Sequence, residues 1–311
     1  MKAKLIEESA RSIPVLHETD VVVVGGSCTG VFAAVRAARL GLRVAIVERQ
    51  NCFGGVATSG NVHIWHSLYD TVQKRKIIGG LTLEVVERLR KRQAVRELQS
   101  ATSAFSINTE ELKIDLDELV VEHKIKPFLH TFCCRCASED NRIKAIIVEN
   151  KSGRGAIVAK QFVDATGDGA LALDLGLPSF QPGSFQPPTT CAKIQGFEQL
   201  AGFDWVAALR EHGSEFGLHE DWGWGSPVTG LADIHMRADS HVFGIDGSDA
   251  EQLTRAEIEG RRQVRAMLDL LRKYGPPKAR VGLVDLAATI GIRETSRICA
   301  GYRLTGDDVL Y

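Results

Sequence analysis

The sequence lacks the features that mark several large classes of protein. It has no surplus of basic residues, because 38 Lys and Arg stand against 39 Asp and Glu, and the formal net charge is -1. This balance gives no support to a nucleic acid or an anionic membrane as the partner. No apolar run approaches the length of a membrane-spanning helix, and residues 1–16 lack the continuous apolar core of a signal peptide. We therefore expect a cytoplasmic protein that uses no membrane and no nucleic acid.

Patterns for disulfides and metal sites are also weak. The seven cysteines are odd in number, which favours reduced thiols over a disulfide framework. Three of them, Cys133, Cys134 and Cys136, lie close together. On a regular strand Cys134 and Cys136 share one face and Cys133 points to the other, so the three thiols cannot converge on one metal ion. The HExxH pattern of zinc enzymes is absent. We expect buried thiols and no metal.

The strongest pattern that is present is a strand–helix–strand unit near the N-terminus. Val21–Val24 is a continuous β-branched run, typical of a parallel strand covered on both faces. Residues 29–40 place small and apolar side chains at helical spacing, and Gly41 follows as a stop. Residues 43–48 make the second strand. The unit is complete within about thirty residues, which is the context that a glycine-rich phosphate loop requires.

The turn between the first strand and the helix has two of the three glycines of a dinucleotide-binding loop. Gly25 permits the tight turn and Gly30 lets the helix pack close to the sheet, so backbone N–H groups and the helix dipole face a pyrophosphate. Ser27 stands where the middle glycine is usual. Glu48, at the end of the second strand, is placed to accept hydrogen bonds from the adenosine ribose, and its charge disfavours NADP.

Two later stretches distinguish FAD from NAD. In residues 49–60, RQNCFGGVATSG, a second pair of glycines follows Glu48 and can pass close under a further part of a long ligand. In residues 163–169, VDATGDG, the end of a strand is expected beside the first strand, with Asp168 free to bond a hydroxyl of the ligand. A domain that binds NAD needs neither stretch. The sequence therefore favours FAD, and an NAD-dependent dehydrogenase is the weaker alternative.

These three motifs in order resemble FAD-dependent oxidoreductases of the glutathione-reductase and succinate-dehydrogenase flavoprotein type. The stretches TRAEIEGRRQV and GIRETSRICAGYRLTGDDVL extend the resemblance over nearly the whole chain. It implies a cofactor site that comprises a pyrophosphate loop (Gly25, Gly26, Ser27, Cys28, Thr29, Gly30), an adenosine side (Glu48, Arg49, and the backbone of Cys133), and segments beside the flavin (Gly54, Gly55, Val56, Ala57, Thr58, Ala165, Thr166, Gly167, Asp168). The sequence departs from the family pattern at Ser27 and at Ser296, where a second arginine is usual.

The expected architecture is α/β: a Rossmann-like FAD-binding domain with a βαβ N-terminus and a β-meander, plus an inserted cap. The 44% apolar content of 311 residues is sufficient for one large domain or two interleaved ones. We place the FAD-binding domain at residues 1–186, the cap or substrate region at 187–280, and a return segment at 281–311. In proteins of this resemblance a further segment completes the flavin site, so we expect the 311 residues to be a truncated form.

Candidates for the chemistry are fewer and less specific. A bound flavin carries out the redox step, and the protein places the substrate over N5 and stabilises charge. Arg293 is the best candidate for binding a substrate carboxylate, with Arg297 nearby; a salt bridge from Arg293 to Glu294 is the structural alternative. His63, His66, His235 and His241 are candidate acids or bases. We expect hydride transfer between a small organic substrate and flavin N5. A non-catalytic, electron-transferring flavin subunit is the alternative, and a homo-oligomer is left open.

Overall fold

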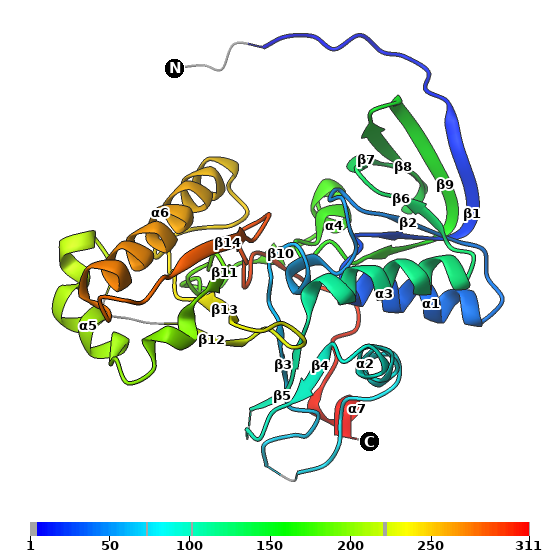
Figure 1. Ribbon diagram of the computed structural model, residues 1–311. Coiled ribbons are helices and arrows are strands. Elements are labelled where there is room, and N and C mark those ends of the chain that lie inside the picture. The colour runs from blue at the N-terminus through cyan, green and yellow to red at the C-terminus, as the bar shows by residue number, and fades with distance from the viewer. Residues whose placement is uncertain (1–4, 73, 101, 220–222, 311) are drawn as a thin grey trace.

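A computed structural model describes residues 5–72, 74–100, 102–219 and 223–310. Two regions lie side by side: a first region around a six-stranded sheet, and a second region with its own sheet and a long helix (Figure 1). The strand order in the first sheet is β6-β2-β1-β9-β8-β7. Its strands are β1 (Val15–Val24), β2 (Val44–Val47), β6 (Lys126–Phe128), β7 (Phe132–Glu139), β8 (Arg142–Asn150) and β9 (Gly153–Asp164).

The first sheet combines a parallel half with an antiparallel meander. β6, β2, β1 and β9 are parallel neighbours, whereas β7, β8 and β9 pair antiparallel. The strand that ends in DATG lies directly beside β1, with Val24 opposite Asp164. This arrangement confirms the predicted Rossmann-like α/β unit with its meander, and it brings the carboxyl ends of β1 and β9 together.

Both faces of the parallel half are covered, which explains the continuous apolar runs. Val21 and Val23 face α1 (Cys28–Arg39), α2 (Leu81–Lys91) and α3 (Thr109–Glu122), while Val22 and Val24 pack on the other face with Leu171 of α4 (Ala170–Asp174). Successive side chains of a strand alternate between its faces, so each must be apolar here. A three-stranded sheet of order β3-β5-β4 lies beside α2, with β3 (Ile64–His66), β4 (Val95–Glu97) and β5 (Ser103–Ile107) (Figure 1).

One position of α3 differs from the helical pattern in the sequence. The pattern predicts Ile114 on the buried face, but its side chain is 51% exposed. The neighbouring Asp115 is fully buried instead, and it accepts hydrogen bonds from Arg88 (3.1 Å) and Arg92 (2.9 Å). Leu116, Leu119 and Val120 are buried as the pattern predicts, and Asp115 lies on the same face of the helix, whereas Ile114 lies off it.

The facing of the clustered cysteines also differs from expectation. β7 carries a bulge at Cys134, because Cys133 pairs with Val148 while Arg135 pairs with Ile147. Because of this extra residue, the side chains of Cys133 and Cys136 lie on the same face of the sheet, where both pack against the core cluster that contains Ile146. The prediction that Cys133 lies opposite Cys136 is therefore wrong. All seven cysteines are free thiols.

The second region, which we call the cap, is an antiparallel sheet covered by helices on one face. Its strand order is β12-β13-β11-β14, with β11 (Ala192–Gln195), β12 (Trp224–Pro227), β13 (Ile234–Ala238) and β14 (Gly282–Leu286). The covering helices are α5 (Trp205–His212) and α6 (Ala250–Tyr274), with short 3-10 turns at Phe197–Leu200 and Gly213–Phe216. α6 buries Val264, Met267, Leu268 and Leu271, as the spacing of apolar residues in the sequence predicts. The sequence also predicts a helix start at Thr254 with Glu257 as its capping partner, but the helix begins at Ala250 with Asp249 as its cap.

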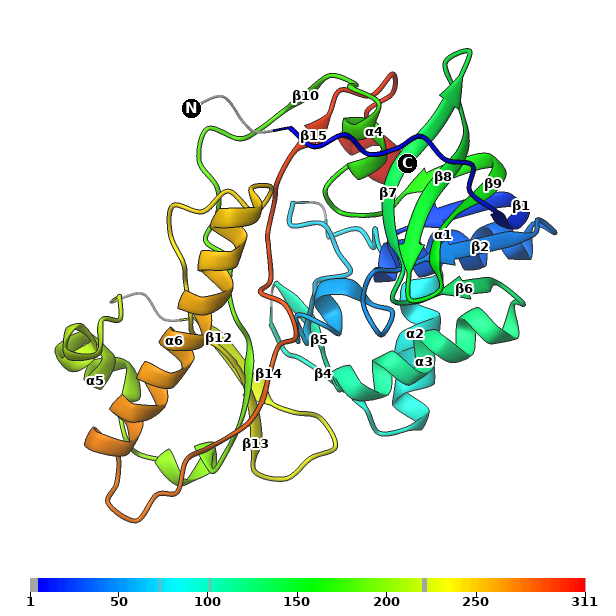
Figure 2. The ribbon, with the colours of Figure 1, turned by 90° about the horizontal axis from the view of Figure 1, so that it is seen from above.

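The chain enters and leaves the cap at one place. β14 lies past residue 280, so the cap sheet extends beyond the boundary expected from sequence. Beyond β11 and β14, Thr189 and Gly291 exchange both backbone hydrogen bonds, at 3.2 and 2.8 Å. Figure 2 shows the segment after β14 passing α6 on its way back to the first region. There β15 (Arg297–Ile298) pairs with β10 (Ser179–Phe180), and the described chain ends in α7 (Gly306–Leu310).

Candidate cofactor site

The turn between β1 and α1 is packed so tightly that its glycines cannot carry side chains. Gly25 has a φ of +97°, and a Cβ there would lie 2.3 Å from the carbonyl oxygen of Ala165. A Cβ on Gly26 would lie 2.6 Å from the Phe53 ring, and one on Gly30 would lie 1.9 Å from the carbonyl oxygen of Gly25. The first turn of α1 contains no acidic residue. The helix N-terminus therefore stays open to a negatively charged group.

Ser27 has a structural role that the sequence alone does not show. It is the N-cap of α1, and its Oγ accepts a hydrogen bond from the backbone N–H of Gly30 (3.3 Å). The same hydroxyl donates to the carbonyl oxygen of Ala165 (3.5 Å), which joins the turn to the end of β9. Its φ is -59°, which any residue adopts, so a side chain is tolerated where the middle glycine is usual.

Substitution of Ser27 should separate capping from binding. Ser27→Ala removes the cap and is expected to lower the free energy of unfolding by about 1 kcal/mol, whereas Ser27→Gly should cost only a few tenths. FAD affinity in Ser27→Gly should be unchanged or slightly higher. Urea unfolding and flavin fluorescence titration measure the two effects. Loss of FAD binding in Ser27→Gly would show that the hydroxyl is itself a ligand.

Glu48 is buried at the end of β2 and faces the same turn. Its side chain is 7% exposed, and its Oε2 accepts a hydrogen bond from the Gly26 N–H (2.6 Å) while Oε1 accepts one from the Gln50 N–H (2.7 Å). Each carboxylate oxygen keeps a second lone pair for another donor such as a ribose hydroxyl. Arg49 points to solvent. Glu48 thus shapes the turn as well as being placed to bind the adenosine side.

The predicted adenine contact at Cys133 lies further along the meander. The backbone of Cys133 is opposite Val148 of β8. The backbone of the Glu48 segment bonds instead to Phe128, His130 and Thr131. The Glu48 N–H donates to the Phe128 carbonyl (2.8 Å), the Thr131 N–H donates to the Glu48 carbonyl (3.0 Å), and the His130 N–H donates to the Gln50 carbonyl (3.0 Å). The role of Cys133 stays a prediction.

The second glycine pair lies directly beside the first turn. The backbone N–H of Gly54 donates to the Gly26 carbonyl (2.8 Å), and Ser27 and Gly54 form an isolated parallel bridge. Gly54 and Gly55 both have positive φ, at +111° and +57°, and lead into a 3-10 turn over Gly55–Ala57. Thr58 closes this turn by donating its hydroxyl proton to the Phe53 carbonyl (2.6 Å). We call residues 54–58 the flavin loop.

The DATGDG segment completes the group. Asp164 accepts hydrogen bonds from the backbone N–H groups of Thr166 (3.1 Å) and Leu171 (2.9 Å), which fixes the loop between β9 and α4. Asp168 accepts one from the hydroxyl of Thr295 (3.1 Å), so the RETSR segment is held against this loop. The structure therefore brings together the three motifs that the sequence places far apart.

The two arginines of the RETSR segment are exposed. Arg297, not Arg293, pairs with Glu294, at 3.0 Å. Arg293 donates from Nε to the carbonyl of Pro187 (3.1 Å), and within the described residues this is its only hydrogen bond. Its terminal nitrogens are available for a negatively charged ligand. The catalytic assignments of both arginines stay predictions.

His63 is the most buried of the candidate histidines, at 1% exposure. Its Nε2 lies 2.8 Å from the Ser226 hydroxyl, and its ring stacks on Trp224. Burial, together with the charges of Arg96, Arg237 and Lys193, lowers the pKa of His63 to about 3. The imidazole is thus neutral at ordinary pH and a weak proton acceptor.

The other three histidines lie elsewhere. His66 is exposed beside the Thr102 carbonyl. His235 packs against Phe197, next to the core cluster beneath α5 and α6, and burial lowers its pKa. His241 is buried, with its backbone N–H and C=O both bound by Gln263. The structure does not gather these histidines into one group, and their catalytic roles stay predictions.

Residues that sequence reasoning missed link the flavin loop to the cap. They are Asn61, Thr109, Lys193, Ser226 and Asp285, and they contact one another or His63 across long sequence separations. No spacing or motif connects them. Three of them, Asn61, Thr109 and Lys193, are buried polar residues, and a sequence displays neither their burial nor their contacts.

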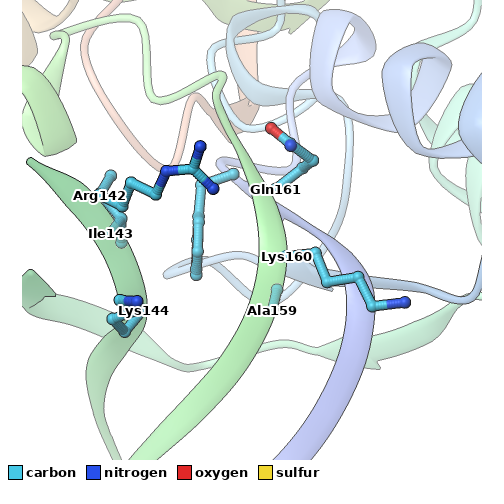
Figure 3. A pocket seen from close by; sticks show the side chains of 7 residues that line it. Arg142, Ile143, Lys144, Ala159, Lys160 and Gln161 are labelled. Carbon is cyan, nitrogen blue, oxygen red and sulfur yellow. The ribbon is translucent and has the colours of Figure 1, made fainter. Parts of the chain in front are cut away.

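A separate pocket of about 570 Å³ lies between β8 and β9, where the two strands diverge (Figure 3). It is lined by Arg142, Ile143, Lys144, Ala159, Lys160, Gln161 and Phe162, none of which is a predicted site residue.

Among the described residues no three His, Cys, Asp or Glu side chains are grouped to hold a metal ion. In the same part of the chain no helix has the length and apolar character needed to cross a membrane.

Comparison with known proteins agrees with this fold. A dihydrolipoyl dehydrogenase of Trypanosoma brucei brucei is 32% identical over 89 residues, which span 25% of this chain and 19% of that protein. A geranylgeranyl bacteriochlorophyll reductase-like protein of Thermoplasma acidophilum superposes with a TM-score of 0.54 at 11% identity, covering 91% of this chain and 67% of the other. An L-proline dehydrogenase of P. horikoshii gives a TM-score of 0.54 at 11% identity, covering 88% and 81%. At these identities the two structures show a shared fold.

The model of one protein family matches almost the whole chain. The match is to "FAD dependent oxidoreductase" and runs over residues 20–311, from the start of the buried part of β1 to the C-terminus. It includes all three glycine-bearing motifs as well as the cap. The chain therefore belongs to the FAD dependent oxidoreductase family, and its cofactor is FAD.

Proposed function

We propose that the chain catalyses hydride transfer between a small organic substrate and the N5 atom of FAD. When bound, the flavin supplies the two-electron chemistry. The pyrophosphate would lie at the N-terminus of α1, where Gly25, Gly26 and Gly30 leave room that side chains would fill. Glu48 would accept hydrogen bonds from the ribose, and the flavin loop with residues 165–168 would hold the rest of the cofactor.

The observation that carries this proposal is the convergence of three motifs at the ends of β1 and β9. The turn at Gly26 bonds to Gly54, Ser27 bonds to Ala165, and Asp168 bonds to Thr295. These contacts place the three motifs next to one another, as a ligand longer than the adenosine half of a dinucleotide would require. This arrangement favours FAD over NAD as the ligand of the site.

The cap is the part of the chain that would select the substrate. Its sheet turns the face opposite to α5 and α6 toward the first region, since Ser226 of β12 bonds to His63 and Asp285 of β14 bonds to Asn61. Arg293 lies where the chain leaves the cap, with its terminal nitrogens available. We expect it to bind a carboxylate or another anionic group of the substrate.

Glu48→Ala tests the cofactor site. We expect FAD binding to weaken by about 1–3 kcal/mol, because the ribose hydroxyls lose a charged acceptor and two backbone N–H groups of the turn lose theirs. Isothermal titration with FAD measures the change. Glu139→Ala, which removes an exposed acid at the far end of β7, is the matched control and should bind FAD as the wild type does. Equal affinity in the two variants would contradict the proposed role of Glu48.

The reaction itself is tested by anaerobic reduction. Purified protein is loaded with FAD, and its flavin absorbance is followed while candidate carboxylate-bearing and neutral substrates are added. Bleaching by a substrate supports the proposed enzyme. The matched control for Arg293→Met is Arg303→Met, which alters an exposed arginine between β15 and α7. Loss of bleaching in Arg293→Met but not in Arg303→Met would place the anionic group at Arg293. Bleaching only by a redox partner protein would favour an electron-transfer subunit.

A further inference from the structure

Asn61 lies at the end of the flavin loop and is held in an unusual backbone conformation. It is 2% exposed and has a φ of +55°, in the left-handed region that asparagine tolerates better than most residues. Its backbone N–H donates to the Thr58 carbonyl (3.1 Å), which is the last residue of the loop. The position of Asn61 therefore constrains the loop directly.

The side chain of Asn61 bonds to both regions of the molecule. Its Nδ2 donates to Oδ2 of Asp285 in β14 of the cap (3.1 Å), and its Oδ1 accepts from the hydroxyl of Thr109 at the start of α3 (3.3 Å). A buried amide with both ends satisfied fixes its neighbours more firmly than an apolar contact does, because each lost bond leaves an unpaired polar group.

Lys193 holds the cap end of this contact. Its side chain is 8% exposed, and it faces Asp285 across the β11–β14 ladder with Nζ 3.4 Å from Oδ2. Its Nζ also donates to the carboxylate of Glu110 at the start of α3. A lysine this buried must keep its acid partners, since an uncompensated charge away from water is costly. Lys193 thus contacts both Asp285 of the cap and Glu110 of α3, and Asn61 bonds to the same two elements through Asp285 and Thr109.

A second contact joins the same two parts. The backbone N–H of Thr289, just after β14, donates to the carbonyl of Ser59, which lies between Thr58 and Asn61 (3.3 Å). The segment that follows the flavin loop is therefore bonded to the cap through both a side chain and the backbone. Any shift of the cap relative to the first region would move residues 59–61.

We propose that Asn61 is a positioning residue that sets the flavin loop through Asp285 and Thr109, with Lys193 holding Asp285 in place. The inference rests on the proposed function, because it assigns residues 54–58 to the flavin. Cap and loop then keep one relative geometry, and the face of the cap that receives the substrate stays aligned with the flavin. The adenosine half of the site, at Gly26 and Glu48, lies outside this linkage.

The separation of the two halves gives a direct test with two ligands. FAD and ADP are titrated into wild type, Asn61→Gly and Lys193→Met. Glycine keeps the positive φ, so Asn61→Gly removes the side chain without straining the backbone. We expect FAD affinity to fall about tenfold in both variants, the loss expected of one hydrogen bond to a charged group, while ADP affinity is unchanged. The visible circular dichroism of the bound flavin should also change, because the loop shifts against the ring.

Lys113→Met is the matched control. Lys113 also pairs with Glu110, at 2.7 Å, but it lies on α3 and does not reach Asp285. It should bind both ligands as the wild type does. If Lys193→Met or Asn61→Gly fails to fold, Asp285→Asn keeps an acceptor for Asn61, removes the charge that Lys193 needs, and should give the same selective loss.

Two results would overturn the inference. Equal weakening of ADP and FAD would mean that Asn61 supports the fold as a whole, and unchanged FAD affinity with an unchanged flavin spectrum would mean that the loop is set without it. Failure of the wild type to bind FAD is a different outcome, since it would contradict the proposed function before any variant is compared.

Discussion

Gly30→Ala is expected to abolish FAD binding and to lower the free energy of unfolding by about 3 kcal/mol. The added Cβ would lie 1.9 Å from the Gly25 carbonyl oxygen and 3.2 Å from the Cβ of Ala165. Both neighbours belong to the turn and to the end of β9, so relief requires the helix to move away from the sheet. That movement carries the N-terminal N–H groups of α1 away from the pyrophosphate. Urea unfolding and FAD fluorescence titration measure the two losses.

Gly79→Ala is the control for this substitution. Gly79 is exposed, and a Cβ there would meet no atom within 4 Å. Its effect should stay within about 0.5 kcal/mol. A Gly30→Ala protein that bound FAD and unfolded like Gly79→Ala would show that the turn can open without harm, and the close approach would then not be a requirement of the site.

His63 should make the protein less stable in mild acid. Its pKa is about 3 in the folded protein against 6.5 for an unperturbed histidine, with burial as the main cause. Between about pH 6.5 and pH 3 the histidine is protonated in the unfolded chain but neutral in the folded protein. The free energy of unfolding therefore falls as the pH drops through this range. At about pH 5 the loss from this one group is about 2 kcal/mol, since each pH unit is worth about 1.4.

The measurement is urea unfolding at about pH 7 and about pH 5. His63→Gln keeps a donor for Ser226 but does not titrate, so its decrease in stability between the two pH values should be about 2 kcal/mol smaller than that of the wild type. His66→Gln, which alters an exposed histidine, should keep the wild-type decrease. Parallel behaviour of wild type and His63→Gln would show that the folded protein does accept a proton at His63.

The fold of the first region is largely predictable from sequence for a physical reason. A parallel strand covered on both faces must be apolar at every position, and Val21–Val24 is. The pyrophosphate turn is also a local structure, because Gly25 directly follows β1 and Gly30 lies in the first turn of α1. The place of β9 beside β1 follows from the DATG motif that ends it. In these cases the cause and its signal lie in the same short stretch of sequence.

The errors occur where distant contacts decide the structure. The bulge at Cys134 changes which cysteines share a face, and nothing in the alternation of side chains announces it. Ile114 is exposed, and the buried position next to it is taken by Asp115, which pairs with Arg88 and Arg92 at the end of α2. Asn61 and Asp285 are 224 residues apart, and their contact exists only once the cap has folded onto the first region. The candidate cofactor residues are therefore visible in the sequence, whereas the residues that align cap and cofactor are not.

The paired backbone of Thr189 and Gly291 makes the cap a detachable unit of the chain. Because the stretch between these residues starts and ends at one point, it can be removed whole and the gap closed by a short turn, without rerouting the strands that hold residues 25–30 and 164–168. The bonds that would need replacement are those between the cap and the first region, which include Asn61 to Asp285, His63 to Ser226, Asn108 to the Thr229 carbonyl and Lys193 to Glu110. The phosphate turn and the cap thus occupy separate stretches of the gene, and a different insertion at this point would have to supply its own partners for Ser59, Asn61 and His63 to work with the same scaffold.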